Sequence, residues 1–502
     1  MPIDYSTPLH YFAALLPEVV LTIGALVVLM VDVFQRGEAG GPARPAVAWL
    51  TVLTLAAAAV ANGWLLGLEE TAPAAVIALD GFRVYTNFLF LGAAALFVPL
   101  SWRHLGEEKM RHGEVYVLIL LATIGMMFFA GTRDLMLIFL GLELMSVAVY
   151  VLTGLNRRDR RSAEAALKYV LLGAFSSAFF LFGIAMVYGG AGSVNLIVIR
   201  AAVGIDGVGA NLLLTSGMAF LAIGFAFKVA AVPFHMWTPD AYEGAPASVT
   251  AFMAAAVKAA AFAAFLRVFL VGFGGMYETW GVLTYWLAVA TMVVANLVAL
   301  AEDSVKRMLA YSSIAHAGYL LVALTAATNL GAASYLYYLV VYTLMTMGSF
   351  AVVYLVAGRH ELRLGLAEYG GLGWRKPVVG VTMTVFLLSL AGVPPTGGFW
   401  GKFAILRSIV ERGGVELAVV LVLTSLVSYY YYLRVAWYMW FREAAPGAAT
   451  PEIHVSAGVR TALVAAAVAV LLLGIFPGEL LEVAERTAAT LTRPLVPGIA
   501  AP

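Results

Sequence analysis

The chain of 502 residues contains no cysteine. This absence excludes disulfide bonds, thiolate metal sites and cysteine-ligated iron–sulfur clusters on this chain, and it leaves the redox compartment open. Charge is also scarce, because Asp, Glu, Lys and Arg make up 12% of the residues, against about 25% in soluble domains. The formal net charge of +1 gives no reason to expect a nucleic acid or a polyacidic partner.

Apolar sequence takes the place of charge, with 62% hydrophobic residues and a mean hydropathy of +0.92. This composition predicts an all-α polytopic membrane protein whose core is a helix bundle in lipid. The apolar segments are too long and continuous for the strands of a barrel. A span needs about 20 apolar residues, and we expect about fourteen spans: 11–34, 45–67, 81–102, 114–131, 134–154, 164–189, 211–243, 247–272, 279–301, 305–327, 331–357, 377–413, 415–441 and 459–477.

Loop charge predicts the orientation of these spans. No Lys or Arg precedes Arg36, so the first span is expected to be a retained helix rather than a cleaved signal peptide. Aromatic residues at helix ends, such as Tyr429–Tyr432, suit anchoring at the membrane interface. Lys and Arg gather in the odd-numbered loops, which predicts that these loops are cytoplasmic and that both termini lie outside. The most basic of them contain Arg157, Arg158, Arg160 and Arg161, and Arg359, Arg363, Arg375 and Lys376.

Two of the expected spans are interrupted near their middle. Pro233 and Pro239 lie in the seventh span, and Pro394, Pro395 and neighbouring glycines lie in the twelfth. Proline removes an intrahelical hydrogen bond and glycine adds backbone freedom, so both helices should break at depth. Matched breaks five spans apart are typical of transporters with inverted repeats. We therefore expect helices 1–3 over residues 1–110, a first five-helix repeat over 111–275, an inverted second repeat over 276–441, and helix 14 with the tail over 442–502.

Ionisable side chains at mid-membrane are the most informative feature of the chain. They are Glu143, Lys228, Lys258 and Lys402. A charge at this depth costs about 2.5–3.5 kcal/mol on insertion scales, so such residues commonly mark a transport path. Snorkelling to the interface is the alternative for a lysine, but neither Lys228 nor Lys258 lies at the end of its predicted span. Since their shared chemistry is protonation, the first hypothesis is proton movement through a membrane.

Two of these residues have a competing structural explanation. Glu143 is the natural partner of Lys228, and the alternative is a buried structural acid bonded to a hydroxyl such as that of Ser146. Lys402 begins the half-helix after the second break, where a cation opposes the helix dipole. That position is unfavourable for Lys402 unless the lysine is often neutral or has a carboxylate or water nearby.

Three further residues are candidates for the same path: His235 at the first break, His316 in the tenth span and Lys168 at the cytoplasmic start of the sixth. Histidine titrates near neutral pH, as a relay requires, and a hydrogen-bonded packing histidine is the alternative. A simple i,i+4 pair with Glu164 explains Lys168 equally well. Arg267 lies near a span end and is expected to snorkel.

Several motifs resemble those of a known family, the antiporter-like membrane subunits of respiratory complex I. The resemblance covers essentially the whole chain, and the motifs are long and specific. They are EAALKYVLLGAFSS at 164–177, FKVAAVPFHMWTPDAYEGAP at 227–246, KRMLAYSSIAHAGY at 306–319 and GVPPTGGFWGKF at 392–403. At the last motif this chain has Pro394-Pro395 and Trp400 where many relatives have smaller or aliphatic residues, which leaves the local packing open.

The resemblance implies fourteen helices, two inverted five-helix repeats, and proton translocation by one subunit of an NADH–quinone oxidoreductase. It implies that Glu143 pairs with Lys228, that Lys258 is a relay and that Lys402 stands on the exit side. No cofactor is implied for this chain, while FMN, iron–sulfur clusters, NADH and quinone belong to the complex as a whole. The implied partners are the lipid of the inner (plasma) membrane, protons, and neighbouring membrane-arm subunits of the M and K types.

Two other hypotheses remain. The same fold and lysines occur, by resemblance, in cation/proton antiporters made of several subunits. Purified redox subunits with flavin and iron would favour the first hypothesis, and small membrane subunits alone would favour the antiporter. A membrane scaffold is the third hypothesis, and it predicts that neutral substitutions at the buried charges leave coupled activity intact.

Overall fold

The structure is a computed structural model, and it describes residues 2–35, 45–72, 74–107, 113–206, 211–358, 361–443, 453 and 455–492. Within these residues, 12 helices are long and apolar enough to cross a membrane, and α9 and α17 are shorter apolar helices. The predicted all-α polytopic fold is therefore confirmed. The number of fourteen spans stays a prediction. It would be reached if α9 and α17 were the first halves of the two interrupted spans.

The helices follow one another in chain order. The N-terminal part contains α1 (Pro8–Ala14), α2 (Leu16–Gln35), α3 (Pro45–Trp64) and α4 (Gly81–Glu107). The middle part contains α5 (Gly113–Gly131), α6 (Leu135–Thr153), α7 (Arg160–Ala191), α8 (Leu196–Asp206), α9 (Leu212–Lys228), α10 (Trp237–Gly244), α11 (Ala247–Phe252) and α12 (Lys258–Arg267). The C-terminal part contains α13 (Tyr277–Ala301), α14 (Val305–Ala326), α15 (Asn329–Ala357), α16 (Leu372–Arg375), α17 (Pro377–Ala391), α18 (Gly397–Glu411), α19 (Val415–Phe441), α20 (Ala457–Ile475) and α21 (Pro477–Thr492). Two short strands, β1 (Pro2–Ile3) and β2 (Glu69–Glu70), pair in parallel.

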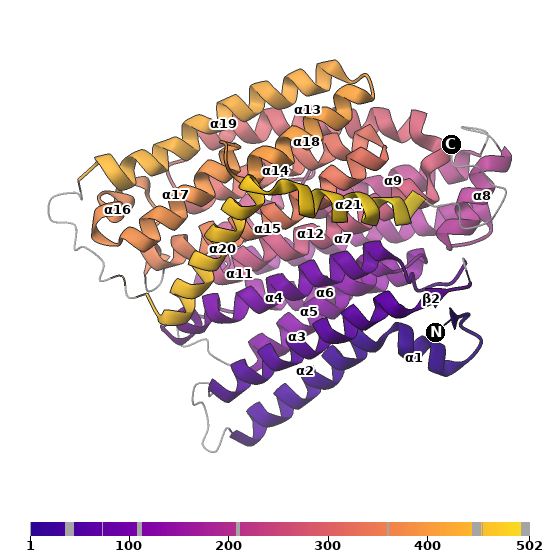
Figure 1. Cartoon of the computed structure of the whole chain (residues 1–502), viewed down its shortest axis with the longest axis horizontal. Helices are drawn as coiled ribbons and strands as arrows, with labels where there is room; N and C mark the ends of the chain where they lie inside the picture. The colour runs from indigo at the N-terminus through magenta and orange to yellow at the C-terminus, as the bar shows by residue number, and fades with distance from the viewer. Residues whose placement is uncertain are drawn as a thin grey trace.

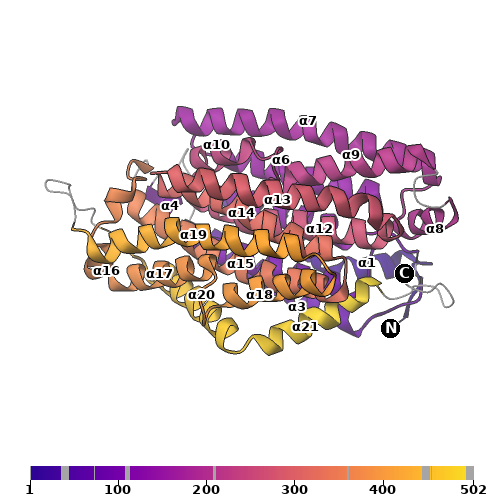
Figure 2. The ribbon, with the colours of Figure 1, turned by 90° about the horizontal axis from the view of Figure 1, so that it is seen from above.

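Long helices run side by side, with α2 and α3 on one side of the bundle and α13 and α19 on the other (Figure 1). Seen from above, α7 follows one edge and α21 the opposite edge (Figure 2). The centre is formed by α14, α15 and the helical stretch Ala247–Gly272, whose apolar windows are 94%, 89% and 94% buried. Alanine dominates the last of these stretches, and its small side chain allows close packing of the neighbouring helices.

The first predicted break is confirmed. α9 ends at Lys228, α10 begins at Trp237, and the residues between them form turns. Side chains replace hydrogen bonds that a continuous helix would have made. The backbone N–H of Val232 donates to Thr291 Oγ1 at 2.9 Å, and the indole of Trp237 donates to the carbonyl of Phe227 at 3.0 Å. Backbone groups inside a membrane need such partners, because lipid supplies none.

The second predicted break is confirmed between Ala391 and Gly397. Again a hydroxyl serves the second half-helix, because the N–H of Gly398 donates to Ser389 Oγ at 3.1 Å. Trp400 fixes the break to a neighbouring helix by donating to the carbonyl of Gly474 at 2.8 Å. A β-carbon on Gly474 would lie 2.2 Å from the carbonyl oxygen of Pro395, so the close packing of α20 on the break requires glycine there. The packing that the sequence left open is thus carried by Trp400 and Gly474.

Several features were not expected from the sequence. Two π-helical segments, Met253–Val257 and Val268–Gly272, bracket α12. α8 lies where only a loop was expected, and α21 follows the last predicted span, because short or charge-bearing amphipathic helices escape a search for apolar runs. The prediction that Arg267 snorkels is wrong, since this side chain is 1% exposed and is ion-paired with Asp80. Tyr432 was expected at the interface but is fully buried in the bundle.

Candidate functional site

Lys228 is the last residue of α9, directly before the first break, and it is 5% exposed. Its Nζ donates to Ser146 Oγ on α6 at 2.7 Å. The ammonium also faces the rings of Tyr150 and Tyr169, with the ring centroids 5.7 and 5.6 Å away. The carboxyl end of a helix favours a cation, and aromatic faces add to this stabilisation. Lys228 is therefore held by a hydroxyl, two rings and a helix dipole.

Glu143 lies one turn before Ser146 on α6 and is half-buried. Its carboxylate accepts a hydrogen bond from Ser177 of α7, and not from Ser146, which the sequence had suggested as a partner. Within the described part of the chain, no ion pair joins Glu143 to Lys228. Ser146, one turn after Glu143 on α6, binds Lys228 of α9, so the predicted pairing stays a proposal whose coupling would act across this hydroxyl.

Lys258 is the first residue of α12 and directly follows a π-helical segment. It is 2% exposed, and its Nζ donates to both oxygens of Ser313 on α14, at 2.6 Å to Oγ and 2.9 Å to the carbonyl. The hydroxyl of Tyr342 on α15 donates to the same Ser313 Oγ at 2.9 Å. Three central helices therefore meet at one serine, and the partners of the ammonium are again neutral oxygens.

Lys402 is buried in α18, beyond the second break. Its Nζ donates to the carbonyl of Ala391, the last residue of α17, at 2.9 Å, and it lies 4.6 Å from the ring centroid of Tyr319. The sequence suggested an unfavourable cation at the amino end of a half-helix. In the fold the side chain reaches back across the break to the carboxyl end of α17, where the helix dipole favours a cation.

His316 lies on α14 between the other groups and is 1% exposed. One ring nitrogen, Nδ1, is hydrogen-bonded to Tyr338, and the other, Nε2, lies 3.0 Å from the hydroxyl of Tyr432. Tyr432 is in turn bonded to Ser312, the neighbour in sequence of the serine that binds Lys258. The ring of Tyr319, which faces Lys402, is 5.3 Å from the His316 ring. His316 thus stands between Lys258 and Lys402 along α14.

His235 and Lys168 lie outside this central group. His235 is in the first break and half-buried, and its Nδ1 has no partner among the described residues. Lys168 is largely exposed and forms ion pairs with Glu164 at 2.7 Å and with Asp240 of α10 at 2.8 Å. The predicted i,i+4 pair with Glu164 is confirmed. Its exposure and its two carboxylate partners suit a surface link between α7 and α10.

Most of the hydroxyl groups that contact the candidate residues were missed by reasoning from the sequence. Helical spacing contains part of the signal, because Ser312 and His316 are four residues apart on α14, and Tyr338 and Tyr342 are four apart on α15. The third helix that contributes, through Tyr432, could not be found from spacing, because it depends on how α19 packs.

Two interrupted helices with buried lysines, packed around a central third helix, define an antiporter-like membrane subunit. The comparisons agree: residues 132–428 match the family model described as NADH:quinone oxidoreductase/Mrp antiporter, TM. The chain is 45% identical to NADH-quinone oxidoreductase subunit N of Trichlorobacter lovleyi, over 94% of this chain and 96% of that protein. It therefore belongs to the subunit N family of NADH-quinone oxidoreductase.

Solved structures show the same fold. A chain of respiratory complex I from Thermus thermophilus, with aureothin bound to the complex, superposes with a TM-score of 0.78 at 36% identity, over 93% of this chain and 98% of that one. A chain of the Mrp complex from Dietzia sp. DQ12-45-1b gives a TM-score of 0.84 at 22% identity, over 97% and 98%. The second likeness concerns the fold alone.

Proposed function

We propose that this chain translocates protons as a membrane subunit of an NADH–quinone oxidoreductase, while electrons pass through other subunits. The proposal rests on the hydrogen-bond partners of the buried lysines Lys228, Lys258 and Lys402. Each is bonded to a hydroxyl or a carbonyl oxygen and not to a carboxylate. A lysine in a tight buried ion pair cannot lose its proton without leaving a buried unpaired carboxylate, which is strongly unfavourable. These lysines avoid that penalty, so they are suited to exchange protons.

The path between Lys258 and Lys402 is proposed to run through hydroxyl groups and His316. Serine and tyrosine hydroxyls both donate and accept hydrogen bonds, and a neutral imidazole donates through one nitrogen and accepts through the other. The chain from Ser312 through Tyr432 to His316 therefore has the groups that a proton needs to pass from bond to bond. Lys168 and His235 are proposed to lie at the entry side, near the first break.

Glu143 is proposed to control the proton occupancy of the lysine row, which is formed by Lys228, Lys258 and Lys402. A change of its charge would act on Lys228 across Ser146, then on Lys258 and finally on Lys402, since neighbouring ionisable groups titrate as a coupled set. Redox energy released elsewhere in the complex would reach this chain as such a change of charge or conformation. In this scheme the half-buried position of Glu143 leaves it accessible to a neighbouring subunit.

The finer assignments belong to the same proposal. Residues 111–275 and 276–441 would be inverted repeats, supported by two breaks that each use a hydroxyl to accept an N–H of the break. From the loop charges, we place both termini outside the plasma membrane. We place M- and K-type subunits next to this chain, at the two ends of the lysine row. FMN and iron–sulfur clusters would reside on other subunits of the complex.

Purification of the intact complex through a tag on this chain tests the proposal. We expect flavin, iron and NADH–quinone activity to co-purify, and Lys228→Ala to depress proton pumping more than assembly. Lys376→Ala, an exposed lysine in a loop, is the matched control and should pump normally. Wild-type pumping in a well-assembled Lys228→Ala complex would contradict the proposal. Co-purification of small membrane subunits alone, with sodium–proton exchange, would favour the antiporter alternative.

A further inference from the structure

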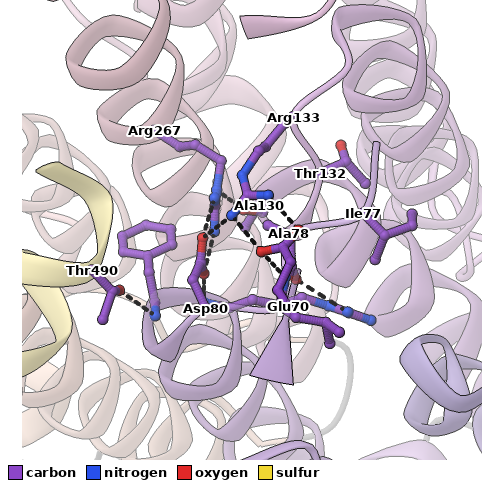
Figure 3. A network of polar contacts seen from close by, with 12 residues as sticks. Glu70, Ile77, Ala78, Asp80, Ala130, Thr132, Arg133, Arg267 and Thr490 are labelled. Atoms are coloured by element: carbon purple, nitrogen blue, oxygen red, sulfur yellow. Dashed lines mark hydrogen bonds and ion pairs between the residues drawn. The ribbon is translucent and has the colours of Figure 1, made fainter. Parts of the chain in front are cut away.

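A buried cluster of ion pairs joins Glu70, Asp80, Arg133 and Arg267 (Figure 3). At its centre, the guanidinium of Arg267 binds the carboxylate of Asp80 with two parallel bonds, of 2.7 Å from Nη1 and 2.8 Å from Nη2. Its Nε donates to the carbonyl of Ala130 at 2.7 Å, and its charge lies 4.8 Å from the ring centroid of Phe82. Two parallel bonds to one carboxylate fix the orientation of an arginine as well as its position.

Asp80 is itself held in place. It stands at the amino end of α4, where its carboxylate accepts the N–H of Arg83 at 2.8 Å, and Arg133 lies 3.5 Å away. Backbone bonds join the segment before Asp80 to the α5–α6 connection, including Ala78 N–H to the Gly131 carbonyl at 3.1 Å. Burial alone would raise the pKa of Asp80, but Arg267 and Arg133 outweigh it and hold this pKa well below its usual range. Asp80 is therefore a charged, immobile anchor.

The segment that this anchor holds is α12, whose two ends carry Lys258 and Arg267. Both ends pass directly into π-helical segments, Met253–Val257 and Val268–Gly272. A π-helical turn holds an extra residue compared with an α-helical turn, and such turns are frequent at functional sites. A shift of one residue would rotate α12 by about 100° and move it by about 1.5 Å along its axis, which would turn Lys258 away from Ser313.

We infer that Asp80 is a positioning residue for Lys258, acting through Arg267 to fix the rotation of α12 between its two π-helical segments. This inference rests on the proposed function of Lys258 in the proton path. It explains why the arginine at the far end of α12 uses Nε and both terminal nitrogens on groups outside its own helix. An arginine that served only to balance charge would not need this fixed geometry.

Asp80→Asn tests the inference in the assembled complex, because it keeps the shape and the capping oxygen but removes the charge that binds Arg267. We expect the pumping rate per complex to fall by about two- to thirtyfold, the range found for residues coupled at a distance. Glu70→Gln is the matched control. It removes a carboxylate from the same cluster, where Glu70 binds Arg133 at 2.6 Å and not α12, and it should pump like the wild type. Asp80→Glu restores a carboxylate and should recover most of the rate.

A double variant separates positioning from general damage. Asp80→Asn should cause no further loss in a Lys258→Ala background, because the residue that it positions is already absent. Arg267→Lys keeps the positive charge of α12 but cannot form the two parallel bonds to Asp80, so it should lose pumping as Asp80→Asn does. It replaces Asp80→Asn in the test if the Asp80→Asn complex does not assemble. Equal pumping by Asp80→Asn and Glu70→Gln, wild-type pumping by Arg267→Lys, or additive losses in the double variant would overturn the inference. Wild-type pumping by Lys258→Ala would instead refute the proposed function.

Discussion

The ammonium of Lys402 lies 2.9 Å from the carbonyl oxygen of Ala391, so a lysine on one half-helix binds the buried carboxyl end of the other. This contact spans the second break and joins α18 to the end of α17. The aromatic face of Tyr319 completes the site, with its ring centroid 4.6 Å from Nζ. A proton that arrives at or leaves Lys402 therefore changes the strength of one contact between the two half-helices.

The first prediction concerns Lys402 itself. Lys402→Met keeps the length of the side chain but removes the proton-carrying amine, and the pumping rate should fall at least about tenfold, since a positioned proton-transfer group contributes a larger factor than this. Phe403→Leu, at the exposed neighbouring position, is the control and should pump normally. The measurement is the initial rate of NADH-driven proton uptake into vesicles, divided by the amount of complex. Equal rates for the two variants would count against a role for Lys402.

The second prediction concerns the hydroxyl of Tyr432, which joins His316 to Ser312. Tyr432→Phe keeps the ring and should slow pumping about three- to thirtyfold if protons pass along this chain. Its neighbour gives a close control, because the buried Tyr431 uses its hydroxyl on Asn296 at 2.9 Å, outside the lysine row. Tyr432→Phe loses two buried hydrogen bonds and Tyr431→Phe loses one, each worth about 1 kcal/mol, so the two variants should differ little in stability while their pumping rates differ clearly. A loss of pumping shared by both would indicate a packing effect.

The third prediction concerns Ser313, the partner of Lys258. Ser313→Ala removes the hydroxyl contact at 2.6 Å and leaves the carbonyl contact at 2.9 Å. We expect a partial loss of pumping, smaller than that of Lys258→Ala, and no additional loss when the two changes are combined. Ser334→Ala is the control, because this buried hydroxyl donates to its own helix at 2.6 Å. Additive losses in the double variant would show that Ser313 acts independently of Lys258.

The fourth prediction tests the packing of α20 on the second break. A β-carbon at Gly474 would meet the carbonyl of Pro395 at 2.2 Å, whereas one at Gly478 would meet nothing within 4 Å. Gly474→Ala should therefore displace the break and lower the pumping rate. It should also lower the free energy of unfolding by about 1–3 kcal/mol, as at other overpacked sites. Gly478→Ala should be neutral or slightly stabilising. Unchanged pumping and stability in Gly474→Ala would show that α20 can move away without effect.

The fifth prediction follows from the lowered pKa of Asp80. Its usual value is 3.8, and the folded value lies below that, so the ion pair adds stability above about pH 3.8 and loses it as the pH falls further. Asp80→Asn should therefore destabilise the detergent-solubilised complex at neutral pH, and the difference from the wild type should begin to shrink as the pH falls below about 3.8. Thermal unfolding followed by tryptophan fluorescence between pH 7 and about pH 3 measures this. A difference that is constant over this range would contradict the assignment.

The breaks and buried charges were predictable from the sequence because their signals are local. Proline at 233 and at 394–395 interrupts apolar runs, and a lysine within such a run stands out by composition alone. The partners of the lysines were not predictable. Whether Lys228 meets Glu143 or Ser146 depends on the rotation of α6 and α9 about their axes, which a hydropathy pattern leaves undefined when a helix is apolar on all sides.

Arg267 shows the same limit at the end of a helix. Its distance from mid-span suggested snorkelling, but Asp80, which captures it, lies 187 residues away in the chain. The two π-helical segments around α12 add to the difficulty, because each inserts a residue and shifts every side chain that follows. Long-range ion pairs and local changes of register are therefore the features that required the three-dimensional fold.

The hydroxyl that accepts a backbone N–H at each break has one more consequence. Thr291 and Ser389 each accept one backbone N–H, from Val232 and Gly398, and neither of these bonds depends on the charge of Lys228 or Lys402. The bent backbone at each break is therefore supported by a neutral hydroxyl, and the lysine beside it can gain or lose a proton while that hydroxyl bond stays in place. A protein that goes through repeated cycles benefits from this separation, because each cycle changes the protonation of a side chain and does not require a helix to refold.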